Sequence, residues 1–338
     1  TRKARSLCSP AQVTAQSGYD AIPHNCPMAT RLMLLDTASL YFRAFYGVPT
    51  SVTSPSGAPV NAARGLLDFI SRLVTDHRPT DLIAAWDDDW RPEFRVAAIP
   101  SYKAHRVAEE AEPELDGESV PDELLPQVKL IEQILQCAGI ARLGMPGYEA
   151  DDVIGSLASQ TTDPVLVVTG DRDLFQLVTD AQPIRVLYTA AKGVGNAEVI
   201  DDAAVFARYG VHAHEYAEFA LLRGDASDGL PGVKGIGEKT AANLIRTYST
   251  LANVIAAAED DSSDLKPGVR KNLLAGRDYI EVAGPVVNVA RDIALPQVES
   301  RLPAEPASPD ELRALSGEWG LTSALDRLAT ALEWQNWS

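Results

Sequence analysis

Nine acidic residues stand where their carboxylates could converge on one place in the fold. They occur singly, in close pairs or in one group of three, in five segments separated by long stretches of chain. The nine are Asp36, Asp87, Glu149, Asp151, Asp152, Asp171, Asp173, Asp225 and Asp228. Two carboxylates about 4 Å apart repel by roughly 4 kcal/mol at an effective dielectric constant of 20. A convergent set would therefore need protons or cations to be tolerated.

The chemistry that such a set could support is metal-dependent hydrolysis. Oxygen ligands select hard cations, so the acids favour Mg²⁺ or Mn²⁺. Two such ions, about 4 Å apart, can activate water and stabilise both the attacking and the leaving oxygen of a phosphodiester. Helix capping is the competing explanation, because an acid at a helix N-terminus contributes about 0.3–1 kcal/mol. Capping accounts for single residues but not for nine that converge.

Alternating strands and helices in the first half of the chain would position these acids. Apolar runs predict strands at 31–35, 81–86, 164–169 and 184–188. Helical periodicity predicts helices over 61–76, 124–138 and 148–158. This alternation predicts an α/β fold, with a mainly parallel central sheet and helices on both faces. Three strands run into Asp36, Asp87 and Asp171, and sites in such sheets form beyond the carboxyl ends of the strands.

After about residue 209 the pattern becomes almost wholly helical. Helices are predicted over 215–222, 238–248, 251–258, 269–274 and 310–332. We therefore expect a disordered tail at 1–29, an α/β domain at 30–210 and a helical domain at 211–338. The stretch 109–123 is strongly acidic and contains no Lys or Arg, which is typical of a solvated surface loop.

A glycine-rich segment, 232–240, joins two of the predicted helices. It is not a Walker A loop, because Glu238 separates Gly237 from the pair Lys239 and Thr240. We interpret it as a tight turn, centred on Gly235, whose backbone N–H groups could bind a DNA phosphate without base preference. The alternative is a plain helix connection with C-cap glycines.

Basic residues accompany this turn and also follow two of the strand-end acids. Near the turn, Lys234, Lys239 and Lys271 could form a phosphate track, or a solvated helix face. After Asp87, basic and aromatic residues alternate in a way that suits a single strand or a frayed end; they are Trp90, Arg91, Phe94, Arg95, Tyr102, Lys103 and Arg106. After Asp36, Phe42 and Arg43 could contact DNA or belong to the core.

Composition limits the remaining possibilities. The 338 residues carry a formal net charge of −17, which argues against a protein that simply coats DNA. No apolar run approaches the roughly 20 residues of a membrane span. Cys8, Cys26 and Cys137 form no CxxC pair, so they do not predict a zinc site. Three sparse cysteines are typical of a reducing cytoplasm.

Six motifs, in this order, carry a resemblance to a known family. They are LLDTASLYFRAF, WDDDWRPEFR, IPSYKAHR, PGYEADDVIGSLA, VVTGDRDLFQL and LRGDASDGLPGVKGIGEKTA. The chain resembles the bacterial flap endonucleases, 5′ nucleases related to the N-terminal domain of DNA polymerase I, from about Leu32 to its C-terminal helices. The resemblance implies a PIN-like nuclease core with a helical arch at about 102–125, followed by a helix–three-turn–helix at about 215–248.

The resemblance also assigns roles to individual residues. Asp36, Asp87, Glu149, Asp151 and a shared Asp171 resemble the shell of a first metal ion. Asp152, Asp173, Asp225 and Asp228 resemble the shell of a second ion or its water-mediated support, with a third ion as a further option. Lys103 and Arg106 resemble phosphate-steering residues at the base of the arch. In the glycine turn, the carbonyls of Val233 and Ile236 are candidate ligands for K⁺.

These assignments imply a standalone, monomeric flap endonuclease and 5′–3′ exonuclease of the cytoplasm. Its partners would be DNA with 5′ flaps, nicks, gaps or 5′ ends, with a functional link to a polymerase and a ligase. The acidic arch segment departs from the family pattern, because only the base of the arch carries cationic side chains. A PIN-like ribonuclease, a haloacid-dehalogenase-type phosphatase and a non-catalytic DNA-binding protein are the alternatives. The turn and the lack of a second Asp two residues after Asp36 disfavour the first two.

Overall fold

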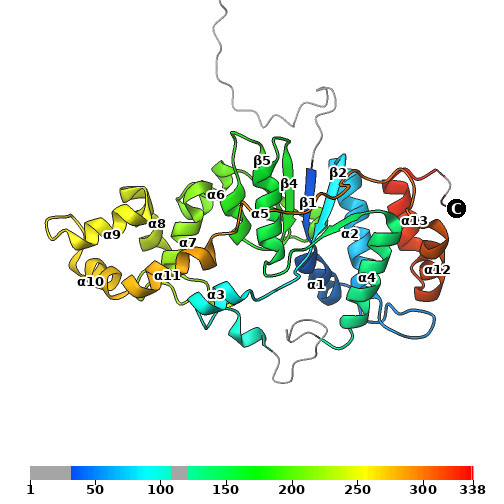
Figure 1. Ribbon diagram of the computed structural model, residues 1–338, viewed down its shortest axis with the longest axis horizontal. Helices are drawn as coiled ribbons and strands as arrows, with labels where there is room; N and C mark the ends of the chain where they lie inside the picture. Colours follow the sequence, from blue (N-terminus) through cyan, green and yellow to red (C-terminus); the bar gives the residue numbers. More distant parts are fainter. Residues whose placement is uncertain (1–31, 108–120, 336, 338) are drawn as a thin grey trace, which may run out of the picture.

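The computed structural model describes residues 32–107, 121–335 and 337. Its centre is a six-stranded sheet in the order β3-β2-β1-β4-β5-β6 (Figure 1). The strands are β1 (Leu32–Asp36), β2 (Asp81–Ala85), β3 (Ala141–Leu143), β4 (Val165–Thr169), β5 (Ile184–Tyr188) and β6 (Glu198–Ile200). All neighbours pair in parallel except β5 and β6, which are antiparallel. The predicted α/β class and mainly parallel sheet are confirmed.

Strands β1 and β4 lie side by side at the centre of the sheet, and the chain leaves them toward opposite edges. Such a reversal of strand order opens a crevice beyond the carboxyl ends of the two strands. Both strands are fully buried, as central parallel strands covered on both faces must be. Asp36 ends β1, and Asp171 follows β4 by two residues, so both acids stand at this crevice.

Helices cover both faces of the sheet. One face carries α1 (Thr37–Gly47), α2 (Asn61–His77), α4 (Leu125–Ala138), α12 (Pro309–Trp319) and α13 (Thr322–Ala331), whose buried side chains form one core cluster. The other face carries α5 (Ala150–Gln160), α6 (Asp202–Tyr209) and α7 (Tyr216–Arg223), which contribute to a second cluster. The short helix α3 (Glu93–Ala98) packs against α11 (Arg277–Val287).

A helical arm extends from one side of the sheet (Figure 1). It continues from α7 through α8 (Glu238–Tyr248), α9 (Leu251–Glu259), α10 (Pro267–Ala275) and α11 (Arg277–Val287). The arm shares the second core cluster through buried residues such as Leu244, Leu273 and Ile280. Residues 288–307, here called the strap, then run back along the sheet to α12. The strap adds an antiparallel bridge between Arg301 and Asp81 at the start of β2.

The described structure corrects several sequence-based boundaries. The predicted helix over 310–332 is two helices, because Gly320 adopts a left-handed conformation with φ of 65° and ends α12. These two helices pack on α4 and α2 rather than on the arm. Strands β3 and β6, three residues each, and helices α1, α3, α6 and α11 were not predicted. The predicted tail at 1–29 and residues 108–120 of the predicted arch lie outside the described residues. None of the described helices has the length and apolar character to cross a bilayer.

Because α13 completes the core on the face of α2, we expect Leu328→Ala to destabilise the whole α/β unit. Leu328 is fully buried in that cluster, and deleting its side chain leaves a cavity. The expected loss is about 2–5 kcal/mol in the free energy of unfolding, measured by urea denaturation. A loss below about 1 kcal/mol would mean that α13 is dispensable for this core.

Candidate active site

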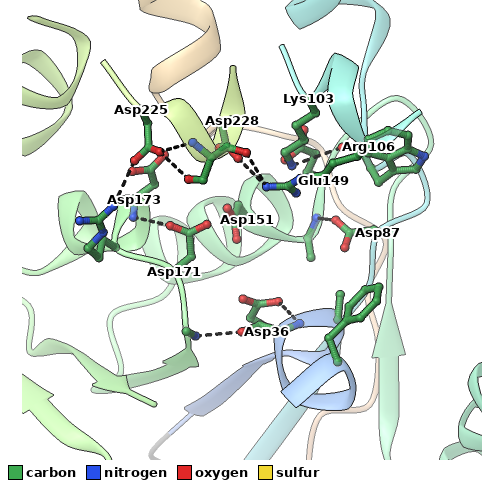
Figure 2. Close-up of a pocket in the computed structure, with 18 residues that line it drawn as sticks. Asp36, Asp87, Lys103, Arg106, Glu149, Asp151, Asp171, Asp173, Asp225 and Asp228 are labelled. Atoms are coloured by element: carbon green, nitrogen blue, oxygen red, sulfur yellow. Dashed lines mark hydrogen bonds and ion pairs between the residues drawn. The ribbon is translucent and has the colours of Figure 1, made fainter. Parts of the chain in front are cut away.

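Eight of the nine predicted carboxylates line one cavity at the carboxyl edge of the sheet (Figure 2). The cavity has a volume of about 320 Å³ and opens where β1 and β4 end. Its acids are Asp36, Asp87, Glu149, Asp151, Asp171, Asp173, Asp225 and Asp228. The predicted convergence therefore holds for these eight residues.

Backbone and hydroxyl donors fix the acids at the strand ends. Asp36 accepts hydrogen bonds from the Ser39 backbone N–H (3.1 Å) and from Thr169 Oγ1 (2.6 Å). The first of these bonds caps α1, so the acid that ends β1 also starts the next helix. Asp87, just past β2, accepts a bond of 2.8 Å from the Ala150 backbone N–H at the start of α5. Strand ends and helix starts thus hold the two carboxylates at the crevice.

Glu149 is the most heavily supported acid of the cavity. Its side chain accepts hydrogen bonds from the Tyr102 hydroxyl (2.8 Å) and Lys103 Nζ (2.6 Å), and Arg95 lies 3.2 Å away. Burial acts to raise the pKa of Glu149, but Lys103 and Arg95 outweigh it, so that the pKa lies below its usual range. Glu149 therefore stays ionised although it is buried.

Other acids of the cavity have strongly raised pKa values. Burial, together with the charge of Asp87, raises the pKa of Asp36 from 3.8 to about 7. Burial and the charge of Asp171 raise the pKa values of Asp151 and Asp173 well above their usual range. Among the described residues, no three His, Cys, Asp or Glu side chains are drawn together into a ready-made ligand set. The carboxylates line the walls instead, as mutual repulsion favours.

Two arginines clamp the loop that carries Asp225 and Asp228. Arg106 donates to Asp228 Oδ1 (2.8 Å) and to the Ser227 carbonyl (3.0 Å). Arg172 pairs with Asp225 Oδ2 at 3.3 Å. Figure 2 shows Asp225 and Asp228 on the wall opposite Asp36. The loop therefore brings the second half of the chain to the edge of the sheet.

Lys103 links this loop to Glu149. Its backbone N–H donates to the Asp228 carbonyl (2.9 Å) while its Nζ reaches Glu149. Lys103 has a φ of 48°, a conformation that costs a non-glycine residue about 1–3 kcal/mol. The close approach also requires Gly229, where a Cβ would lie 2.1 Å from the Ser101 carbonyl oxygen. Both predicted catalytic cations, Lys103 and Arg106, thus line the cavity.

The structure corrects the predictions for Asp152 and Arg95. Asp152 does not line the cavity, because its Oδ1 accepts from Arg95 Nη2 (2.7 Å) and from the Ala290 backbone N–H (2.8 Å), and its Oδ2 accepts from the Glu149 backbone N–H. Arg95 was predicted to contact DNA, but its side chain is 3% exposed and faces the carboxylates of Asp152 and Glu149. Both residues therefore position Glu149 rather than reaching a metal ion or a substrate.

The other predicted contacts on this side differ in their exposure. Tyr102 is buried, with its hydroxyl on Glu149, so the prediction that it contacts DNA is also corrected. Arg91 is half-buried and donates to the carbonyls of Tyr102 and Pro100, which supports the segment that carries Lys103. Phe42 lines the cavity, whereas Arg43, one residue further along α1, does not.

The predicted glycine turn joins α7 to α8, away from the cavity. Lys234, Lys239 and Lys271 are exposed there, and the side chains of Val233 and Ile236 are buried. The turn is tight: the Ile236 backbone N–H donates to the Val233 carbonyl, and that of Thr240 to the Gly237 carbonyl. A Cβ at Gly235, whose φ is 80°, would lie 2.5 Å from Asn272 Nδ2 of α10. Roles for these residues in binding phosphate or K⁺ remain predictions.

Sequence reasoning missed several residues of the cavity. Ser39 and Arg172 line it, and Thr169 holds Asp36 from β4. The signal for Arg172 was present, since it stands between two of the predicted acids in the segment Gly170–Asp173. Ser39 and Thr169 carried no signal, because a hydroxyl near a strand end usually belongs to a turn.

The cavity lies at the switch point of a parallel sheet, and its clustered carboxylates favour the binding of cations. Such a site is suited to phosphodiester hydrolysis. Comparison with known proteins places the chain in a class of nucleases. Residues 31–210 match the family model of the N-terminal resolvase-like domain of 5′-3′ exonucleases. Residues 211–310 match the model of their C-terminal SAM fold. The chain therefore belongs to the 5′-3′ exonuclease family, and the predicted nuclease activity is confirmed.

Individual relatives agree with this placement. A 5′-3′ exonuclease of Streptomyces coelicolor is 57% identical over 300 residues, which cover 89% of this chain and 99% of the relative. DNA polymerase I of Mycobacterium bovis is 37% identical over 89% of this chain but 32% of its own length. The flap endonuclease of bacteriophage T5, solved with DNA and metal ions, has a TM-score of 0.55 at 18% identity, over 90% of this chain and 99% of that one. The last likeness shows the fold.

The raised pKa of Asp36 predicts a pH-dependent stability in the presence of a chelator. The folded chain binds this proton more tightly than the unfolded chain does, so stability falls as the pH rises from about 4 toward 7. A shift of one pKa unit corresponds to about 1.4 kcal/mol. Between pH 5 and pH 7.5, the free energy of unfolding should therefore fall by about 2 kcal/mol more in the native chain than in the variant Asp36→Asn. Urea denaturation at both pH values measures this. Equal losses in the two proteins would contradict the assignment of the proton to Asp36.

The buried position of Arg95 predicts a defect of stability rather than of DNA affinity alone. Arg95→Met leaves Asp152 and Glu149 buried without their shared cation, and breaking such a pair costs about 3–5 kcal/mol. Urea denaturation should show this loss. Arg72→Met, which removes an exposed pair with Asp76 on α2, should cost less than about 1 kcal/mol. An Arg95→Met protein of native stability would return Arg95 to the list of DNA contacts.

Proposed function

We propose that the cavity binds two or three divalent cations, Mg²⁺ or Mn²⁺, and that the protein hydrolyses DNA phosphodiesters at 5′ flaps, nicks, gaps and 5′ ends. The observation that carries this proposal is the gathering of eight carboxylates in one cavity, several with strongly raised pKa values. Membership of the 5′-3′ exonuclease family supports the reaction, and the T5 enzyme solved with DNA and metal ions supports the ligands.

The donors in the cavity fit hard divalent cations, since the acids supply oxygen ligands and several repel one another when no cation is bound. Asp36, Asp87, Glu149 and Asp151, with Asp171 shared, would hold one ion. Asp173, Asp225 and Asp228, from the opposite wall, would hold another. When bound, such ions lower the pKa of water and stabilise charge on the attacking and leaving oxygens.

Cationic side chains of the protein would orient the carboxylate ligands and partly balance their charge. Lys103 holds Glu149 in place and favours its ionised form, so that its carboxylate would be available as a ligand. Arg106 keeps Asp228 at the cavity while 36% of its side chain stays exposed, which leaves part of the guanidinium free to meet a phosphate. Trp90 and Phe42 line the same cavity and offer apolar surface to a nucleotide.

The helical arm would hold the duplex beside the cavity. The exposed Lys234, Lys239 and Lys271 flank the turn of Gly235 and Gly237, and they would bind backbone phosphates without reading bases. The carbonyls of Val233 and Ile236 would coordinate K⁺. Catalysis would then belong to the α/β unit together with the loop of Asp225 and Asp228, and duplex binding to the helical arm from α8 to α11.

The relatives suggest the cellular setting. Matches to DNA polymerase I support a functional link with a polymerase, and nick or gap processing implies a ligase as the next enzyme. The protein would act as a monomer in the cytoplasm, where its DNA lies.

Removing the central acid tests the catalytic proposal. Asp171→Asn should lower cleavage of a 5′-flap duplex by more than about 100-fold, beyond the 10–100-fold loss typical of residues outside the ligand shell. Chelation of divalent metal should abolish cleavage by the native chain, and Mg²⁺ or Mn²⁺ should restore it. Asp76→Asn on α2 serves as the control.

The substrate panel decides between functions. A 5′-flap duplex, single-stranded RNA and a phosphomonoester are assayed side by side with gel and phosphate-release readouts. Preference for RNA or for the monoester would overturn the proposal, and so would full activity of Asp171→Asn.

A further inference from the structure

A third cation lines the cavity besides Lys103 and Arg106. Arg172 stands between Asp171 and Asp173, and its side chain reaches the cavity wall. This side chain is 41% exposed, although it lies among the carboxylates that line the cavity. An exposed guanidinium inside an acidic cavity is available to an anionic ligand.

A second arginine already pairs with the carboxylate that Arg172 contacts. Its Nη2 lies 3.3 Å from Asp225 Oδ2, and Arg223 Nη2 lies 3.4 Å from the same oxygen. Arg223 is 11% exposed, so Asp225 already has a buried cationic partner. Among the described residues, Arg172 makes this one ion pair, which leaves most of its five N–H donors for another partner.

The arginines around the cavity fall into two classes by exposure. Arg95 and Arg223 are only 3% and 11% exposed and hold carboxylates, as positioning residues must. Arg106 and Arg172 are 36% and 41% exposed, and each holds a different acid of the loop 225–228. Arg172 therefore resembles Arg106, the predicted phosphate contact, and not the buried pair.

The two exposed arginines belong to different sides of the cavity. Figure 2 shows Arg106 and Lys103 on the side of Glu149 and Asp87, with Asp225 on the other side. Through its contact with Asp225, Arg172 belongs to that other side. A DNA strand that crosses the acids would pass from one cation to the other, and each would lie near a different phosphate.

We infer that Arg172 binds a backbone phosphate next to the scissile phosphate, on the side of the cavity opposite Lys103 and Arg106. The inference rests on the proposed hydrolysis of DNA in this cavity. Arg172 would contribute to substrate alignment by neutralising a phosphate that the surrounding carboxylates would otherwise repel. One charge-assisted hydrogen bond of this kind corresponds to about a 10–100-fold change in kcat/KM.

The test pairs a protein variant with a neutralised phosphate. A series of 5′-flap duplexes carries one methylphosphonate each, at successive positions on both sides of the scissile bond. For native protein, kcat/KM should fall at the positions that cations contact. For Arg172→Gln, kcat/KM on the unmodified duplex should fall about 10–100-fold, and the penalty of one methylphosphonate should disappear. Arg172→Lys should recover part of both effects, and Arg72→Gln on α2 should behave like the native chain.

The possible results distinguish phosphate binding by Arg172 from a role in holding Asp225. If Arg172→Gln keeps every methylphosphonate penalty, or if it shifts the metal concentration for half-maximal activity instead, then Arg172 acts by holding Asp225 and the inference is wrong. If the penalty that Arg172→Gln abolishes lies on the same side of the scissile bond as the penalty that Arg106→Gln abolishes, Arg172 does not bind a phosphate on the side opposite Arg106. The inferred position is then wrong. If native protein cuts none of the duplexes with Mg²⁺ or Mn²⁺, the proposed function itself fails.

Discussion

Repulsion among carboxylates that share one small cavity is the constraint on which this structure depends. Each of them has lost hydration, and several lie close enough to raise the pKa of a neighbour. A fold that places them together must offset this cost with donors and cations of its own. Asp36 is held by Ser39 and Thr169, Asp87 by the start of α5, and Glu149 by Tyr102, Lys103 and Arg95. The remaining repulsion is what makes the cavity receptive to cations.

The arrangement of donors explains why so many separate segments meet at the cavity. Arg95, from α3, pairs with Asp152 of α5, and Asp152 also accepts from Ala290 of the strap. Arg106 and Lys103 draw the loop of Asp225 and Asp228 toward the sheet. The bonds of Ala290 with Asp152, and of Arg106 and Lys103 with Asp228, join the first half of the chain to the second. The acids thus organise the contact between the sheet and the arm as well as the site itself.

Sequence reasoning predicted the parts of the fold that periodicity and strand chemistry dictate. Long apolar strands and the acids at their ends were found, because a buried parallel strand is a continuous hydrophobic run. Strands β3 and β6 escaped because three residues are too few for a period. Helix 310–332 was predicted whole because its apolar positions continue past Gly320.

The site was predictable by residue type but not by orientation. Asp151 and Asp152 are adjacent acids at the start of one helix, yet one lines the cavity and the other faces Arg95. Neighbouring helical positions point about 100° apart, and sequence alone does not say which of them faces the site. Arg95 and Arg172 show the same limit, since one is buried and the other exposed although both follow strand-end acids. Burial by other segments decided these roles.

The strap has a consequence for how the chain folds. It returns the chain to the sheet only after the arm is complete, and α13 and Trp334 then close the core that β1 and α2 began. This core thus brings together residues from distant parts of the sequence, from Met33 of β1 to Trp334 after α13. Contacts of such long range form late, because the chain between them must first be ordered. During synthesis, the face of α2 that packs on α13 would stay uncovered until α13 had emerged, and the nascent sheet would need protection from aggregation for that interval.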